Sequence, residues 1–158
     1  MNQALAAILT PEFGYSVLRV TTPILFATLA ALISDKAGVM NIALEGIMLM
    51  SALTGVYVSA VSGSAWVGLV AAVVAGGLVG LFLAYCALKL RTDIILSGIA
   101  INLMGGGGTV FILFLLTGDK GISSSLASQV LPKITIPGLA GIPVLGTLLS
   151  GHHVLTYT

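Results

Sequence analysis

Four long apolar segments dominate this sequence and determine the solvent in which it can fold. They run from about residue 15 to 33, 39 to 61, 65 to 88 and 94 to 116. A helix that crosses the hydrocarbon core of a bilayer needs about 17–25 residues, so each segment is long enough. Because 58% of the residues are hydrophobic and only 7% are charged, a soluble domain of this size could not bury its apolar surface. The sequence therefore predicts an all-α fold, a polytopic transmembrane bundle of about four to five spanning helices.

The chain is expected to form a single transmembrane domain over residues 1–158, with a loop at 117–151. That loop is rich in Gly, Pro and Ser, and the apolar stretch after it resembles the beginning of a further helix. Lys36 follows the first apolar segment, while Lys89 and Arg91 follow the third, two crossings later. Basic residues favour the cytoplasmic side, so the 117–151 loop is predicted to be extracytoplasmic, although Lys120 and Lys133 then fall on the outer side.

Polar residues at the start of the second segment need an explanation in so apolar a chain. Asn41 and Glu45 are four residues apart and would share one helix face. Asn41 is a plausible N-cap, which would place Glu45 in the first turn, near the positive end of the helix dipole. Either Glu45 holds a neighbouring helix or loop by hydrogen bonds, or it lines or gates a path for a solute. Charged groups inside a bilayer favour the second alternative only when they lie deep.

A second group of unusual residues lies in the fourth segment, where Asn102 precedes four consecutive glycines, Gly105, Gly106, Gly107 and Gly108. Glycine disfavours a helix by about 1 kcal/mol relative to alanine, so these residues are a candidate helix break. The alternative is an unbroken helix whose glycines allow tight packing. A break would place this segment against protein or a water-filled path, because bare backbone is not tolerated in lipid.

Other local patterns concern packing and helix ends. The third segment carries small residues every four positions, which predicts a face for close helix contact: Ala72, Gly76, Gly80 and Ala84. In the first segment, Pro23 predicts either a kink or a helix start capped by Thr22. In the turn before the fourth segment, Thr92 is a plausible N-cap.

The sequence offers no support for catalysis or for a cofactor. It contains no recognisable catalytic triad order, HExxH or CxxC motif, and the glycine run lacks the Lys-Ser/Thr of a phosphate-binding loop. His152 and His153 are adjacent and would not naturally face one metal ion together. The net charge of +1 gives no basic field for nucleic acid. We therefore expect neither a metal, a cofactor nor a nucleic-acid partner.

Three stretches resemble one family of membrane proteins. "SDKAGVMNIALEGIMLMSAL", "LRTDIILSGIAINLM" and "ITIPGLAGIPVLGTLLSGHHVLTYT" occur in this order. They resemble motifs of bacterial ABC importer permeases of the ribose/branched-chain amino acid type, closest to the nucleoside (simple-sugar-like) branch. The resemblance extends from about Pro23 to Tyr157. It departs at Ala43, where the family pattern usually has Gly, and at the four-glycine run.

The resemblance implies a role and a set of partners. The chain resembles an N-terminal half, since such permeases are about twice as long. It would be a multi-pass protein of a prokaryotic plasma membrane and would form part of a path for nucleosides or sugar-like solutes. Its partners would be a cytoplasmic ABC ATPase, a second permease subunit and an extracytoplasmic solute-binding lipoprotein. The polar residues expected nearest the path or its scaffold are Asn41, Glu45 and Asn102.

Two other functions fit the same residues. Broken helices and an intramembrane carboxylate are also found in ion-coupled secondary carriers and in channels, which work without an ATPase. A third possibility is a permease fragment that does not transport by itself.

Overall fold

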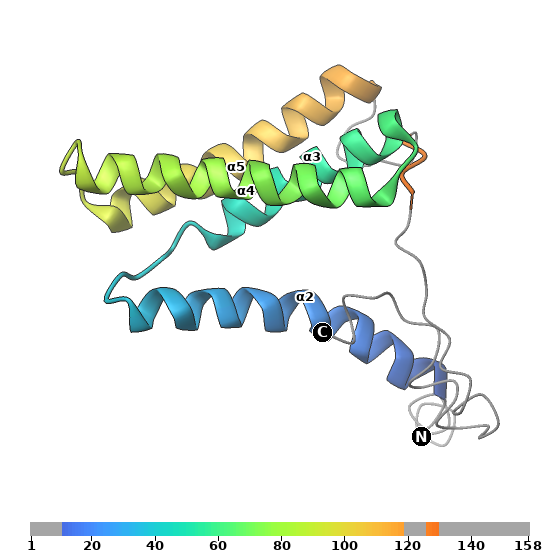
Figure 1. Cartoon of the computed structure of the whole chain (residues 1–158), viewed down its shortest axis with the longest axis horizontal. Helices are drawn as coiled ribbons and strands as arrows, with labels where there is room; N and C mark the ends of the chain where they lie inside the picture. Colours follow the sequence, from blue (N-terminus) through green and yellow to red (C-terminus); the bar gives the residue numbers. More distant parts are fainter. Residues whose placement is uncertain (1–10, 119–125, 130–158) are drawn as a thin grey trace, which may run out of the picture. The chain divides into compact units, whose positions relative to one another are not determined.

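The computed structural model describes residues 11–118 and 126–129, and it confirms the all-helical prediction. The described helices are α2 (Pro11–Lys36), α3 (Leu44–Ser62), α4 (Ala65–Leu88) and α5 (Ile94–Thr117). Figure 1 follows them by colour along the chain. All four are long and apolar enough to cross a membrane. Most of the predicted loop at 117–151, and the pair His152–His153, lie outside the described residues.

The chain divides into two compact units, and the packing described below is confined to residues 31–130, which form one of them. The other unit contributes only residues 11–30 to the described part, all of them in α2. This helix passes through Pro23 and does not begin there, so Thr22 is not its N-cap. The Thr22 hydroxyl instead donates to the Leu18 carbonyl oxygen at 2.8 Å.

Helices α3 and α4 form an antiparallel hairpin whose two backbones approach closely. Gly63 ends α3 in the left-handed region (φ 66°), and its N–H donates to the Ser59 carbonyl oxygen. A Cβ atom built on Gly68 would lie 2.6 Å from the Ser59 Cβ and 2.7 Å from the Gly55 carbonyl oxygen. A Cβ on Gly55 would lie 3.0 Å from that of Ala72. Small residues on both helices therefore set the distance between them.

The small-residue face predicted for α4 contributes unevenly to this hairpin. Gly76 faces α3, because a Cβ there would lie 2.6 Å from the Ser51 Oγ. Gly80 has nothing within 4 Å of the corresponding position, and Ala84 lines an open groove described below. The close contact with α3 also includes Gly68, four residues before the first residue of the predicted face.

These contacts predict opposite effects for two identical substitutions in α4. Gly68→Ala should lower the thermal stability of the detergent-solubilised protein, since the new methyl group meets the α3 backbone and overpacking costs about 1–3 kcal/mol. Gly80→Ala should be neutral or stabilising, because its methyl group points into open space and alanine favours a helix. Melting curves of the two variants and the wild type would decide. Equal stability of the two variants would contradict this hairpin.

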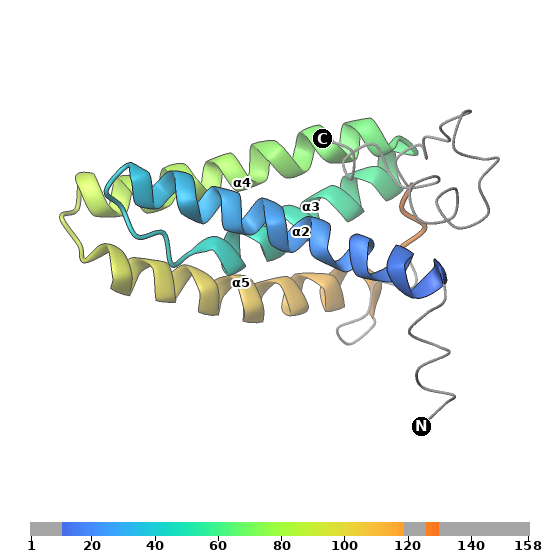
Figure 2. The same ribbon diagram turned by 90° about the horizontal axis from the view of Figure 1, so that it is seen from below.

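Helix α3 lies between α4 and α5 and packs against both, as Figure 2 shows. The three helices meet in a small core made by Ala43 (fully buried), Leu83 and Ile101, which Ile47, Val79 and Ile94 partly cover. Most other large apolar side chains are exposed, as expected for helices whose solvent is lipid. The core is therefore concentrated where α3 begins, and there the polar residues of interest gather.

Candidate functional site at the start of helix α3

Helix α3 begins later than its apolar sequence suggests. The second spanning segment was predicted from about Val39, but residues 39–43 are not helical and the first helical residue is Leu44. Gly38 turns the chain with φ 80°, and the Ser34 hydroxyl donates to the Val39 carbonyl oxygen at 2.9 Å. The N-cap position of α3 is Ala43, which has no side chain to cap the helix.

Asn102, on the neighbouring helix α5, supplies the missing polar partners. Its Nδ2 donates to the Ile42 carbonyl oxygen at 2.7 Å, and its Oδ1 accepts from the Gly46 N–H, also at 2.7 Å. Gly46 is the third residue of α3, so this N–H is one of the donors that a helix start leaves unpaired. One carboxamide thus satisfies a carbonyl before the helix and an N–H within its first turn.

The start of α3 is recessed along α5. Ile42 and Ala43 pack against Gly98, where a Cβ would lie 3.2 Å from the Ala43 nitrogen. Asn102 is nine residues beyond Asp93, the N-cap of α5, so it lies roughly 13 Å along that helix at 1.5 Å per residue. Residues 39–43 therefore run beside the first turns of α5. Irregular backbone can lie at such depth only when protein groups satisfy it, as Asn102 does here.

Two glycines let α3 and α5 approach to backbone contact just below this point. A Cβ on Gly46 would lie 2.5 Å from the Ile101 carbonyl oxygen, and one on Gly105 would lie 2.5 Å from the Gly46 Cα. Any side chain at either position would push the helices apart. The hydrogen bonds of Asn102 depend on this approach, because they span the same two helices.

Asn41 also acts on the backbone at this site. Its Oδ1 accepts from the Ala43 N–H at 3.1 Å, which stabilises the turn before α3. The predicted capping role is wrong in position, since Ala43 and not Asn41 is the N-cap. The structure thus brings Asn41 and Asn102 to the same short segment, residues 41–46.

Glu45 lies in the first turn of α3, as predicted. Unlike the carboxamides of Asn41 and Asn102, its carboxylate does not bind the backbone of residues 41–46. Its side chain is exposed. Among residues 11–118 and 126–129 it has no hydrogen-bond or ion-pair partner. It therefore does not hold any neighbouring helix or loop in that part of the chain. The carboxylate is left available at the recessed end of α3.

The four-glycine run does not interrupt α5, which continues from Ile94 to Thr117. Of the two alternatives, the structure has the unbroken helix. Gly105 makes the contact with α3, and the Thr109 hydroxyl donates to the Gly105 carbonyl oxygen at 2.6 Å. A Cβ atom at any of the next three glycines would meet nothing within 4 Å: Gly106, Gly107 and Gly108.

The turn from α4 to α5 is fixed by hydrogen bonds. Asp93 is the N-cap of α5, and its Oδ1 accepts from the N–H groups of Ile95 (2.8 Å) and Leu96 (3.4 Å). The predicted cap, Thr92, instead donates through its hydroxyl to the Cys86 carbonyl oxygen at 2.8 Å. Arg91, between these anchored residues, has a left-handed backbone (φ 53°) that is unusual outside glycine.

One polar contact at the other end of the bundle had no sequence signal. Ser59 is only 4% exposed, and its Oγ accepts from the Gln129 N–H at 3.1 Å. This ties residues 126–129 back to α3, 70 residues away in sequence. Only an unexpected buried serine in an apolar segment could have indicated it. The described residues contain no cluster of His, Cys, Asp and Glu that could hold a metal ion.

The four helices of spanning length describe a multi-pass membrane protein. The chain belongs to the family of branched-chain amino acid transport system permease components, which matches residues 15–140. That match includes the whole recessed site and all of α3, α4 and α5.

Individual relatives agree with this family. The chain is 36% identical over 132 residues to the guanosine ABC transporter permease protein NupQ of Bacillus subtilis, covering 80% of this chain and 41% of that protein. It is 34% identical over 116 residues to the putative glucose ABC transporter permease protein TsgC13 of Haloferax volcanii, covering 73% and 33%. It is 28% identical over 136 residues to the nucleoside ABC transporter permease protein NupC of Lactococcus lactis, covering 81% and 41%. The chain thus spans about two fifths or less of these relatives' length, and no solved structure matches it significantly.

Proposed function

We propose that this chain forms part of the translocation path of an ATP-binding cassette importer for nucleosides or related sugar-like solutes. The family match and the names of three relatives, which mention guanosine, nucleosides and glucose, support this proposal. In the proposed importer the permease performs no covalent chemistry. A cytoplasmic ATPase drives the cycle, a second permease subunit completes the path, and an extracytoplasmic lipoprotein delivers the solute.

The observation that carries the assignment of roles is the difference between Glu45 and the two asparagines. Asn41 and Asn102 use their carboxamides on the backbone of residues 41–46, so we assign them to the scaffold. Glu45 extends from that scaffold with a carboxylate that no described residue engages. A carboxylate is a strong acceptor for the hydroxyl groups of a ribose or a hexose. We therefore assign Glu45 to the path.

This assignment predicts a loss of transport in the isosteric variant Glu45→Gln. A hydrogen bond to a charged group contributes about 1.5–3 kcal/mol, so initial uptake of radiolabelled guanosine should fall about tenfold or more. Asp35→Asn is the matched control, because it removes another exposed carboxylate, in the last turn of α2. Uptake is measured in cells that express the complete transporter and lack other nucleoside importers. Wild-type uptake by Glu45→Gln, at equal membrane abundance, would contradict the assignment of Glu45 to the path.

The same cells test the class of transporter. Copurification from native membranes in mild detergent should recover an ATPase, a second permease subunit and a binding lipoprotein. Uptake should stop when ATP is depleted and continue when an ionophore collapses the proton and sodium gradients. The opposite dependence would establish the ion-coupled carrier, for which the available Glu45 carboxylate is the favourable observation.

A further inference from the structure

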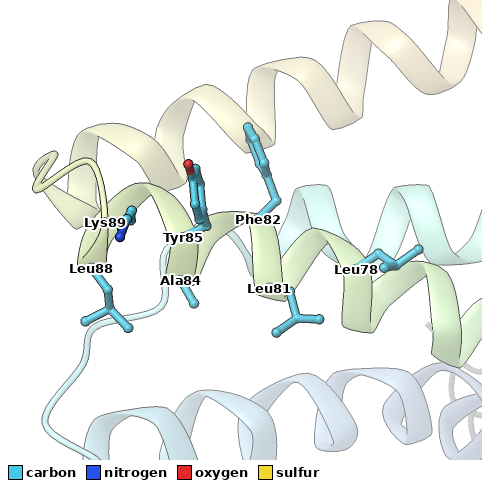
Figure 3. Close-up of a pocket in the computed structure, with 7 residues that line it drawn as sticks. All are labelled: Leu78, Leu81, Phe82, Ala84, Tyr85, Leu88 and Lys89. Carbon is cyan, nitrogen blue, oxygen red and sulfur yellow. The ribbon is translucent and has the colours of Figure 1, made fainter.

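Helix α4 carries an open groove on a surface that α3 and α5 do not cover (Figure 3). The groove has a volume of about 620 Å³, and its lining comes from α4 and the C-cap residue Lys89. Two rows of side chains at helical spacing border it. Leu81, Ala84 and Leu88 form one row, while the other row consists of Leu78, Phe82, Tyr85 and Lys89. The lining is apolar except at one end, where the Tyr85 hydroxyl and the Lys89 amine lie one turn apart.

The length of this groove matches one leaflet of a bilayer. Lys89 is eleven positions after Leu78, which is roughly 16 Å along an α-helix. Half of a hydrocarbon core of about 30 Å is nearly the same distance. Leu81 and Leu88 are 67% and 82% exposed, so these side chains are available to an acyl chain. A groove of this length is long enough to hold an acyl chain of one leaflet.

The polar end of the groove is positively charged. Lys89 and Arg91 are both exposed, and neither has an ion-pair partner within the described ranges. The nearby Asp93 carboxylate is engaged with N–H groups at the start of α5. The hydrogen bonds of Thr92 fix the turn, so the two cations are presented from a defined backbone. By contrast, the α3–α4 turn, Ser62 to Ser64, has no charged residue.

We propose that this groove binds an anionic phospholipid from the leaflet on the charged side of the membrane. One acyl chain lies along Leu78, Leu81 and Leu88, and the phosphate group lies against the Lys89 amine. Tyr85 contributes an apolar ring to the chain and a hydroxyl to the headgroup region, as interfacial tyrosines do. Charge complementarity argues for this occupant, because one phospholipid supplies both an acyl chain for the exposed leucines and a phosphate for the exposed Lys89 amine. The proposal is independent of which solute is transported.

Native mass spectrometry of the complete transporter tests this site. The complex is purified from vesicles of phosphatidylcholine with phosphatidylglycerol, and the retained lipids are counted. A basic residue near an anionic surface contributes about 1 kcal/mol, so Lys89→Gln should lower retained phosphatidylglycerol about fivefold. Lys36→Gln, which removes another interfacial cation, should retain the wild-type amount. Phosphatidylcholine should be unaffected in both variants.

A second measurement identifies the occupant directly. A photoreactive benzoylphenylalanine at Leu81 should cross-link to phospholipid in native membranes, and Lys89→Gln should reduce the anionic share of that product. Cross-linking to a protein segment or to a second copy of the chain would overturn the proposal. So would equal phosphatidylglycerol retention in the wild type and Lys89→Gln. Both outcomes are read on complexes that elute as intact assemblies, which excludes misfolding as the cause.

Discussion

Replacing Gly105 by alanine is expected to separate α3 from α5 and to destabilise the protein by about 1–3 kcal/mol, the usual cost of overpacking. The added methyl group would meet the Gly46 Cα at 2.5 Å and its carbonyl oxygen at 3.0 Å. Both are backbone atoms, so no side-chain rotation can relieve the contact. The loss should appear as a lower melting temperature of the detergent-solubilised transporter and as less protein in the membrane.

The glycine run provides a matched control for this experiment. Gly107→Ala introduces the same methyl group two residues later in α5, where nothing lies within 4 Å. It should be neutral or should stabilise the helix by up to about 1 kcal/mol. If Gly105→Ala and Gly107→Ala melt at the same temperature, the close approach of α3 and α5 is wrong. If Gly107→Ala alone impairs transport while remaining folded, another helix must approach that glycine in the assembled transporter.

Asn102→Leu is expected to have the other large effect, because it removes both polar partners of the recessed segment at once. The Ile42 carbonyl and the Gly46 N–H would each lose a hydrogen bond of 2.7 Å. An unsatisfied buried backbone group costs about 1–3 kcal/mol; the hydrogen bond to the Gly46 N–H is partly buried and the one to the Ile42 carbonyl is exposed to solvent or lipid, so the first loss is the larger. The variant should therefore be less stable and more readily cleaved by protease within residues 37–43.

Asn41→Ala is the appropriate control for Asn102→Leu. It removes one acceptor from the Ala43 N–H within a local turn, so the expected loss is about 1 kcal/mol or less. A loss as large as that of Asn102→Leu would show that the turn, and not the link to α5, holds the recessed segment. Asn102→Leu with wild-type stability and protease resistance would contradict the proposed scaffold.

The spanning helices could be predicted from the sequence because the signal for them is local. An apolar run of spanning length has to be a helix in lipid, so the predicted ends of the third and fourth segments agree with α4 and α5 within a residue. The start of α3 could not be predicted in this way. Asn41 indicated a helix start nearby, but residues 39–43 are otherwise apolar, and one of the groups that holds them outside the helix is Asn102, about 60 positions later.

The same distinction explains the polar site. Local patterns in residues 41–45 were enough to single out Asn41 and Glu45, since polar groups in an apolar run are conspicuous. Local patterns could not separate a carboxamide that binds backbone from a carboxylate that stays available. Nor could they distinguish Gly105 from the three glycines after it, or Gly68 from Gly80. Those differences arise from the crossing of two helices, which brings only one glycine of each set to the contact.

The recessed start of α3 has a consequence for the order in which the chain enters the membrane. Asn102 forms hydrogen bonds with the Gly46 N–H and the Ile42 carbonyl, which are synthesised 56 and 60 residues before it. While α3 and α4 are being synthesised, the Ile42 carbonyl and the Gly46 N–H have no protein partner and must keep water. We therefore expect the α3–α4 hairpin to insert with residues 37–43 still at the membrane surface. These residues should reach their final position only after α5 has been inserted, because Asn102 is part of α5. This end of the bundle is therefore expected to assemble last.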